Sequence, residues 1–131
     1  MVLVGLMFLL LGQPVIAAEK EIVTPQSYDY MANSTSDIDS YDSNVTVTGI
    51  TQTSSAVDKI VTTVYLEKET SSGGWTTVDS WTKTVYNTSY CKASGTKSVS
   101  SGYYRARCSH KVYEGNLVET NYSQSTKYKV N

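Results

Sequence analysis

Histidine and cysteine are scarce in this sequence, which has one histidine, His110, and two cysteines, Cys91 and Cys108. A zinc site needs four close ligands in a recognisable spacing, and these three residues do not supply one. The chain also lacks a glycine-rich phosphate loop, a Gly-x-Ser-x-Gly motif and a His-Glu-x-x-His motif. The sequence therefore predicts no metal centre, no cofactor and no catalytic residue.

Charged residues are absent from the first 18 positions, which form an apolar run ending in a proline and small residues. This pattern is typical of a secretory signal peptide, with cleavage after Ala17 or Ala18. A membrane span needs about 20 apolar residues, and Gly-Gln-Pro at positions 12–14 interrupts this run early. We expect residues 1–18 to be a signal peptide, the protein to be secreted or associated with the cell wall, and no membrane span to remain. The Lys or Arg that normally precedes the apolar run of a signal peptide is missing here. An uncleaved membrane anchor is the alternative.

Helical patterning is also missing, since no segment carries an apolar stripe at the period of a helix and no long repeat occurs. Thr, Ser, Val and Tyr dominate instead, which is the composition of β-strands. We interpret residues 19–34 as a flexible acidic leader. Alternating apolar and polar positions then predict about seven strands. The expected fold is a single antiparallel β-sandwich over residues 35–131, immunoglobulin-like or fibronectin type III-like in general shape.

Charge is unevenly distributed along the chain. Residues 19–79 contain ten acidic and three basic residues, whereas residues 80–113 contain six basic and no acidic residue. The two halves can neutralise each other by packing together, or the basic half can attract an anionic partner. Nucleic acid is not an expected partner, because the chain is exported and weakly acidic overall.

The basic half contains the stretch SGYYRARCSH, in which alternation separates two faces. Tyr103, Arg105, Arg107 and Lys111 fall on the face that suits solvent, and we predict that they bind a ligand. Because arginine binds phosphate and carboxylate groups well, the expected partner is an anionic cell-wall polymer, a glycan or a protein. An ordinary solvated face, or pairing with the acidic half, is the alternative.

The two cysteines lead to a further prediction. If their strands form a hairpin turning near Val99 and Ser100, Cys91 lies opposite Cys108, and a disulfide between them is possible. In a secreted chain with an even number of cysteines, we expect this bond to form. Free thiols are one alternative, and a nucleophile–base pair of Cys108 and His110 in a secreted enzyme is another.

Trp75 and Trp81 are the two tryptophans of the chain. On a regular strand they share one face with their rings about 20 Å apart, too far to hold one sugar ring between them. We interpret Trp75, Trp81 and Tyr104 as core aromatics, with a bulge between the tryptophans allowing both to be buried. A ligand platform is the alternative. Tyr104, shortly after a glycine turn, also resembles the tyrosine corner of immunoglobulin-like domains.

The order of these elements resembles a family of small secreted proteins of Gram-positive bacteria that is known only as a domain of unknown function. Its pattern has a strand ending in Leu-x-Lys, a Trp-x-x-Val-x-x-Trp strand, and a Gly-x-Tyr-Arg strand followed by Glu-Thr. In this sequence those positions are Leu66 and Lys68; Trp75, Val78 and Trp81; Gly102, Tyr104 and Arg105; Glu119 and Thr120. The resemblance implies export and a compact β domain, and it carries no catalytic residue across.

The expected function is therefore that of a secreted, non-catalytic β module that binds a wall polymer, a glycan or a protein at the bacterial surface. A structural protein that associates with itself, through the edges of its terminal strands and its opposed charges, is the competing class.

Overall fold

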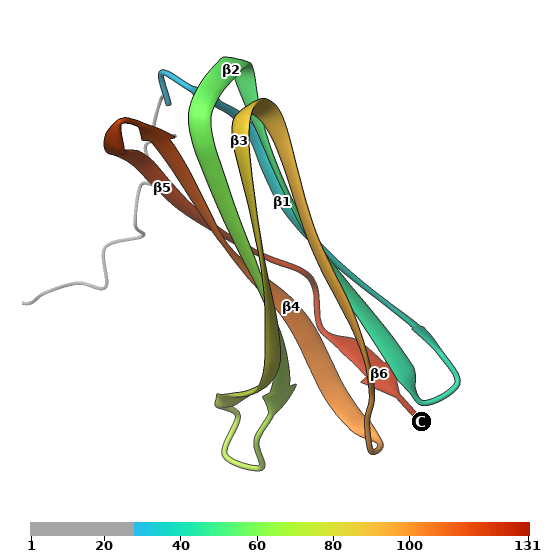
Figure 1. Ribbon diagram of the computed structural model, residues 1–131. Coiled ribbons are helices and arrows are strands. Elements are labelled where there is room, and N and C mark those ends of the chain that lie inside the picture. Colours follow the sequence, from blue (N-terminus) through green and yellow to red (C-terminus); the bar gives the residue numbers. More distant parts are fainter. Residues whose placement is uncertain (1–27) are drawn as a thin grey trace, which may run out of the picture.

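The computed structural model describes residues 28–131, and this part of the chain is all-β, with no helix (Figure 1). The predicted signal peptide, residues 1–18, and residues 19–27 of the predicted leader lie outside the described residues. Residues 31–34, assigned to the leader by sequence, belong to the first strand. The strands are β1 (Met31–Tyr41), β2 (Asn44–Glu69), β3 (Trp75–Ser98), β4 (Gly102–Glu114), β5 (Asn116–Gln124) and β6 (Tyr128–Val130).

β2 and β3 are long strands that bend and run back in the opposite direction. β2 has 26 residues and β3 has 24. The register between them shifts between Gln52 and Val57, and Asn87 of β3 has a φ of 50°, a left-handed conformation that asparagine tolerates. Both strands therefore turn over at the same level, at the top of Figure 1. We call residues 75–86 and 91–98 the first and second limbs of β3.

The antiparallel all-β fold predicted from the sequence is confirmed. Six strands form one continuous sheet in the described residues, rather than about seven, because segments that the sequence pattern separates are joined within β2 and β3. The first part of β2 pairs with β1, and its last part pairs with β4, which in turn pairs with β5 and β6. The sheet curls strongly as a result, and it forms a half-barrel (Figure 1).

The inner face of the curl is the hydrophobic core. Alternate residues of β2 and β4 point inward, and the fully buried ones include Val47, Val64, Leu66 and Ala106. The two halves of the curl approach closely at Gly49, where a Cβ atom would overlap the Sγ atom of Cys108. Glycine at this position therefore lets β2 pack directly on β4.

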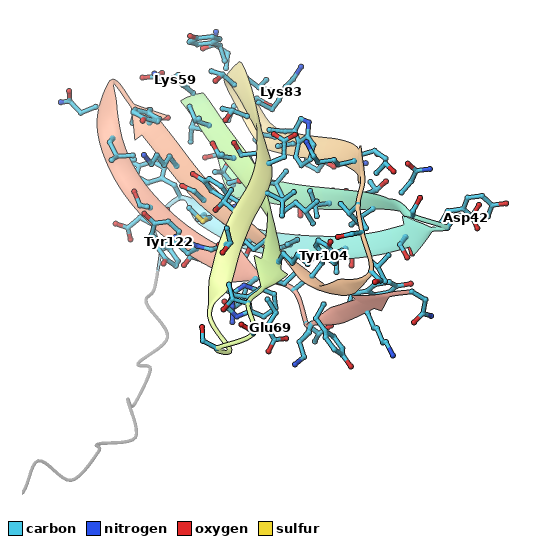
Figure 2. The ribbon with its side chains drawn as sticks, turned by 90° about the horizontal axis from the view of Figure 1, so that it is seen from below. Asp42, Lys59, Glu69, Lys83, Tyr104 and Tyr122 are labelled. Carbon is cyan, nitrogen blue, oxygen red and sulfur yellow. The ribbon has the colours of Figure 1, made fainter. Side chains whose placement is uncertain are left out.

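Tyr104 anchors the start of β4 inside this core. Its side chain is 1% exposed, and its hydroxyl donates a hydrogen bond of 2.7 Å to the carbonyl oxygen of Ser100. In Figure 2 it lies between the strands, whereas Asp42 and Tyr122 lie at the periphery. A hydrogen bond back to the chain a few residues upstream is the feature that defines a tyrosine corner.

The edges of the sheet differ from one another. Side chains of β5 form hydrogen bonds to β1 and to the residue before it, and they close one side of the half-barrel. The bonded pairs are Glu119 with the N–H groups of Tyr30 and Met31, Asn121 with Ser34, and Ser123 with Ser36. β3 pairs with β2 alone among the described strands. Its other edge therefore borders the open side of the half-barrel.

Candidate functional site

The two cysteines are buried free thiols in different parts of the core, so the predicted disulfide is wrong. The prediction assumed a hairpin of β3 and β4. Instead, β2 lies between these strands, with Cys91 opposite Thr51 and Cys108 opposite Val64. β4 pairs with the last part of β2 because its apolar face, including Tyr104, completes the core there.

We expect the Cys108 thiol to be inert in the folded protein. Burial, with the nearby Cys91 as a smaller cause, raises its pKa to about 12. Relative to the ordinary value of 9.0, this lowers the thiolate fraction at pH 8 about a thousandfold. In a Cys91→Ala variant, iodoacetamide at pH 8 should therefore modify Cys108 at least a hundredfold more slowly than the same protein in urea. Equal rates, measured by mass spectrometry, would show that Cys108 is accessible and reactive.

His110 is the centre of a buried chain of hydroxyl groups. Its imidazole is 0% exposed, with Nδ1 2.6 Å from Oγ1 of Thr51 and Nε2 2.7 Å from Oγ of Ser123. Thr51 continues the chain to Thr62, 2.7 Å away, and Ser123 continues it to Ser36. These contacts come from four strands, so the chain of hydrogen bonds ties the two halves of the curl together.

The surroundings of His110 favour its neutral form. Burial lowers its pKa to about 4, and the Sγ atom of Cys108 lies 3.8 Å from Nδ1. A nucleophile–base pair needs a thiol that gives its proton to the imidazole. Here, burial disfavours both the thiolate and the imidazolium, and the arrangement suits a packed polar core better than covalent catalysis.

The four predicted ligand-binding residues lie together on the outer face of β4. The register with β2 and β6 places Tyr103 opposite Lys129, Arg105 opposite Glu67, Arg107 opposite Tyr65 and Lys111 opposite Val61. Residues that pair across strands point to the same side of a sheet. The sequence pattern therefore identified one continuous surface, which we call the outer face.

Arg105 is engaged by the protein itself. Its Nε atom donates to Oε1 of Glu67 at 2.8 Å, and its guanidinium lies 4.2 Å from the ring centre of Trp75. The side chains of Arg105 and Glu67 are 20% and 6% exposed. Both partners of Arg105 come from the acidic half of the sequence. The contacts of Arg105 therefore favour the alternative in which the two halves of the chain neutralise each other, and its guanidinium is not free to bind a ligand.

Arg107 is the more open of the two arginines, because 44% of its side chain is exposed and Glu67 Oε2 is 3.9 Å away. Its guanidinium lies 5.7 Å from the ring centre of Tyr65 and 5.5 Å from that of Tyr122. Cations held beside aromatic rings, with part of each exposed, can bind an anionic chain laid across them.

Lys127 adds a cation to the outer face that the sequence pattern did not single out. Its Nζ atom lies 4.6 Å from the ring centre of Tyr103 and 3.0 Å from Oε2 of Glu69. Lys127 precedes β6, so strand alternation gave no signal for it. Tyr122 and Tyr65 were also missed, since their strands were placed without the register that brings them beside Arg107.

The two tryptophans lie on opposite faces of the sheet. The predicted bulge exists, since Leu66 pairs with Asp79 and Glu67 pairs with Thr77. It turns Trp75 to the outer face, where its ring contacts Arg105, and leaves Trp81 on the inner side, packed against the core. Both indoles are partly exposed.

A groove at the open side of the half-barrel was not predicted from the sequence. It has a volume of about 530 Å³. We call it the β3 groove, and its lining comes from both limbs of β3: Ser80, Trp81, Thr82, Lys83, Lys92, Ala93 and Ser94. The two groups are at least nine positions apart in the sequence, and only the bend of β3 brings them together.

No three His, Cys, Asp or Glu side chains are grouped as a metal site within residues 28–131, and no helix in this part is long and apolar enough to cross a membrane. Comparison with models of known protein families found no match, and comparison with curated proteins found no similar sequence. The outer face and the β3 groove are therefore the two surfaces from which a function can be inferred.

Proposed function

We propose that this protein is a secreted, non-catalytic β module that binds an anionic cell-wall polymer or an acidic glycan at the bacterial surface through its outer face. The observation that carries the proposal is the exposed guanidinium of Arg107 beside the rings of Tyr65 and Tyr122. Lys111 lies on the same face of the same strand. These groups offer positive charge and ring faces together, which suits an extended anionic chain.

The buried carboxylate of Glu67 supports this role. It is 6% exposed and holds Arg105 at 2.8 Å, whereas its contact with Arg107 is longer, at 3.9 Å, and 44% of the Arg107 side chain stays exposed. A basic surface with its own carboxylates largely covered keeps its attraction for a polyanion. Such an attraction weakens as salt is added, because exposed charges are screened over about 10 Å at 0.1 M ionic strength.

The experiment is a pull-down of the protein on immobilised poly(glycerol phosphate) and on polygalacturonate at low salt. We expect Arg107→Ala/Lys111→Ala to bind about tenfold more weakly than wild type, and 0.5 M NaCl to release the wild type. Lys83→Ala/Lys92→Ala loses the same charge from the β3 groove, and it should lose less binding. Equal binding by wild type and Arg107→Ala/Lys111→Ala would overturn the proposal.

We extend the proposal to the fold type and the family of the protein. In this proposal the two halves of the curled sheet are the two layers of a module of the immunoglobulin-like or fibronectin type III-like kind. The packing of Gly49 on Cys108 and the hydrogen bond of the Tyr104 hydroxyl support this interpretation. The protein belongs with the small secreted Gram-positive proteins whose sequence pattern it resembles. Export after removal of residues 1–18 would place it outside the cell.

Self-association is a second candidate function, because β3 leaves one edge unpaired among the described strands. An exposed edge can pair with the same edge of a second copy. Lys83 and Lys92, which lie beside the groove at this edge, would oppose the approach of an equally charged copy. Light scattering over a hundredfold range of concentration distinguishes the two functions, since a constant mass would exclude self-association over that range.

A further inference from the structure

The β3 groove is held open by contacts between the two limbs of β3. Trp81 of the first limb packs on Gly95 of the second, where a Cβ atom would overlap the indole ring. Asp79 and Lys97 form an ion pair of 3.0 Å between the same limbs. The limbs are therefore fixed relative to each other on the inner side, and the groove lies along their free edges.

The lining of the groove combines three kinds of group. Trp81 offers part of an indole, since it is only partly buried against the core. Lys83 and Lys92 contribute one ammonium group from each limb, and both residues are exposed. Three hydroxyl groups complete the polar lining, from Ser80, Thr82 and Ser94.

Carboxylates are absent from this lining. The nearest carboxylate along the strand is that of Asp79, which forms an ion pair with Lys97. The hydrogen bond from Lys97 holds the pKa of Asp79 below its usual value. Lys83 and Lys92 have no carboxylate partner in the groove, so the groove is positively charged. Ligand sites of small molecules have volumes of about 300–1,000 Å³, and 530 Å³ falls within that range.

The geometry points to a second binding site in the β3 groove, for a short saccharide that carries a carboxylate or a phosphate. An apolar edge of the sugar contacts the exposed part of the Trp81 indole, its acidic group lies between Lys83 and Lys92, and its hydroxyls reach the serine and threonine hydroxyls. This site is separate from the outer face: it uses other residues and takes a short ligand rather than an extended polymer.

The sequence allows a direct test, because Trp75 and Trp81 are its only tryptophans. In a Trp75→Phe variant, Trp81 in the groove is the single indole, and its fluorescence reports on that site alone. The variant is titrated with trigalacturonic acid, with a short glycerol phosphate oligomer and with neutral maltotriose. We expect saturable fluorescence changes with at least one of the two anionic ligands, and at least tenfold weaker binding of maltotriose.

Two charge variants are compared in the Trp75→Phe background. Lys83→Ala/Lys92→Ala should weaken anionic binding at least tenfold, whereas Arg107→Ala/Lys111→Ala should leave it within twofold of the parent. Both lysines are exposed, so circular dichroism and thermal melting should show an unchanged fold. Binding of one anionic ligand alone identifies whether carboxylate or phosphate is the preferred group.

Three results would overturn the inference: no saturable signal with either anionic ligand, unchanged binding by the groove variant, or equally tight binding of maltotriose. Each leaves the pull-down on long polymers unaffected, since that experiment depends on Arg107 and Lys111. The proposal of binding at the outer face and the proposal of binding in the groove are therefore tested independently, with different variants and different ligands.

Discussion

Replacing Gly95 by alanine should destabilise the protein by about 3 kcal/mol, although it adds a single methyl group. That methyl would occupy the position of ring atoms Cδ2 and Cε2 of Trp81. The indole cannot move inward, because it already packs against the core that contains Val64 and Ala93. Either the limbs of β3 separate or the indole leaves its site, and both responses lose buried contact. The measurement is the free energy of unfolding in urea.

A double-mutant cycle isolates this clash. In a Trp81→Val background the space beside Gly95 is vacated, and Gly95→Ala should there be neutral or stabilising by up to about 1 kcal/mol, because alanine restricts the unfolded chain. Gly74→Ala is the matched control: its Cβ would meet only Oγ1 of Thr70, at 3.3 Å in an exposed turn. We expect that control to change stability by less than about 0.5 kcal/mol. A cost for Gly95→Ala that is the same in both backgrounds would show that Trp81 does not rest on Gly95.

The strand β4 shows where local sequence patterns predicted the structure correctly. Alternation in SGYYRARCSH correctly separated the inner residues Tyr104, Cys108 and His110 from the outer residues Arg105 and Arg107, because β4 is a regular strand. The period of two depends on nearest neighbours along the chain, so it holds wherever the strand has no bulge.

The errors arose where strands bend. The predicted disulfide needed β3 and β4 to be neighbours, but β2 lies between them. Nothing in the residues around Cys91 indicates that β3 folds back at Asn87, since polar residues there are equally consistent with a turn between two strands. The β3 groove was missed for the same reason: Lys83 and Lys92 come together only because of that bend.

Acidification from pH 7 to pH 4 should remove about 3 kcal/mol of stability through His110 alone. The unfolded chain takes up a proton on this residue at about pH 6.5, whereas burial delays uptake in the folded protein to about pH 4. Between these values the unfolded state binds more protons, so the free energy of unfolding falls as the pH falls. Protonation in place would also put a charge beside Cys108 and between the hydroxyls of Thr51 and Ser123, in a site with 0% exposure of the imidazole.

Carboxylates begin to contribute at the low end of this range, among them Asp79, whose pKa the hydrogen bond from Lys97 lowers from the ordinary 3.8, so that the unfolded chain takes up this proton first. A His110→Gln variant separates their effect, because glutamine can still hydrogen-bond to Thr51 and Ser123 but does not titrate. At pH 7 the variant should be less stable than wild type, since the amide does not reproduce the imidazole geometry. By pH 4 the difference in unfolding free energy should have shifted in favour of the variant by about 3 kcal/mol. Parallel stability curves for the two proteins would mean that His110 is protonated as readily in the folded state as in the unfolded one, and that the buried chain of hydroxyls accommodates the charge.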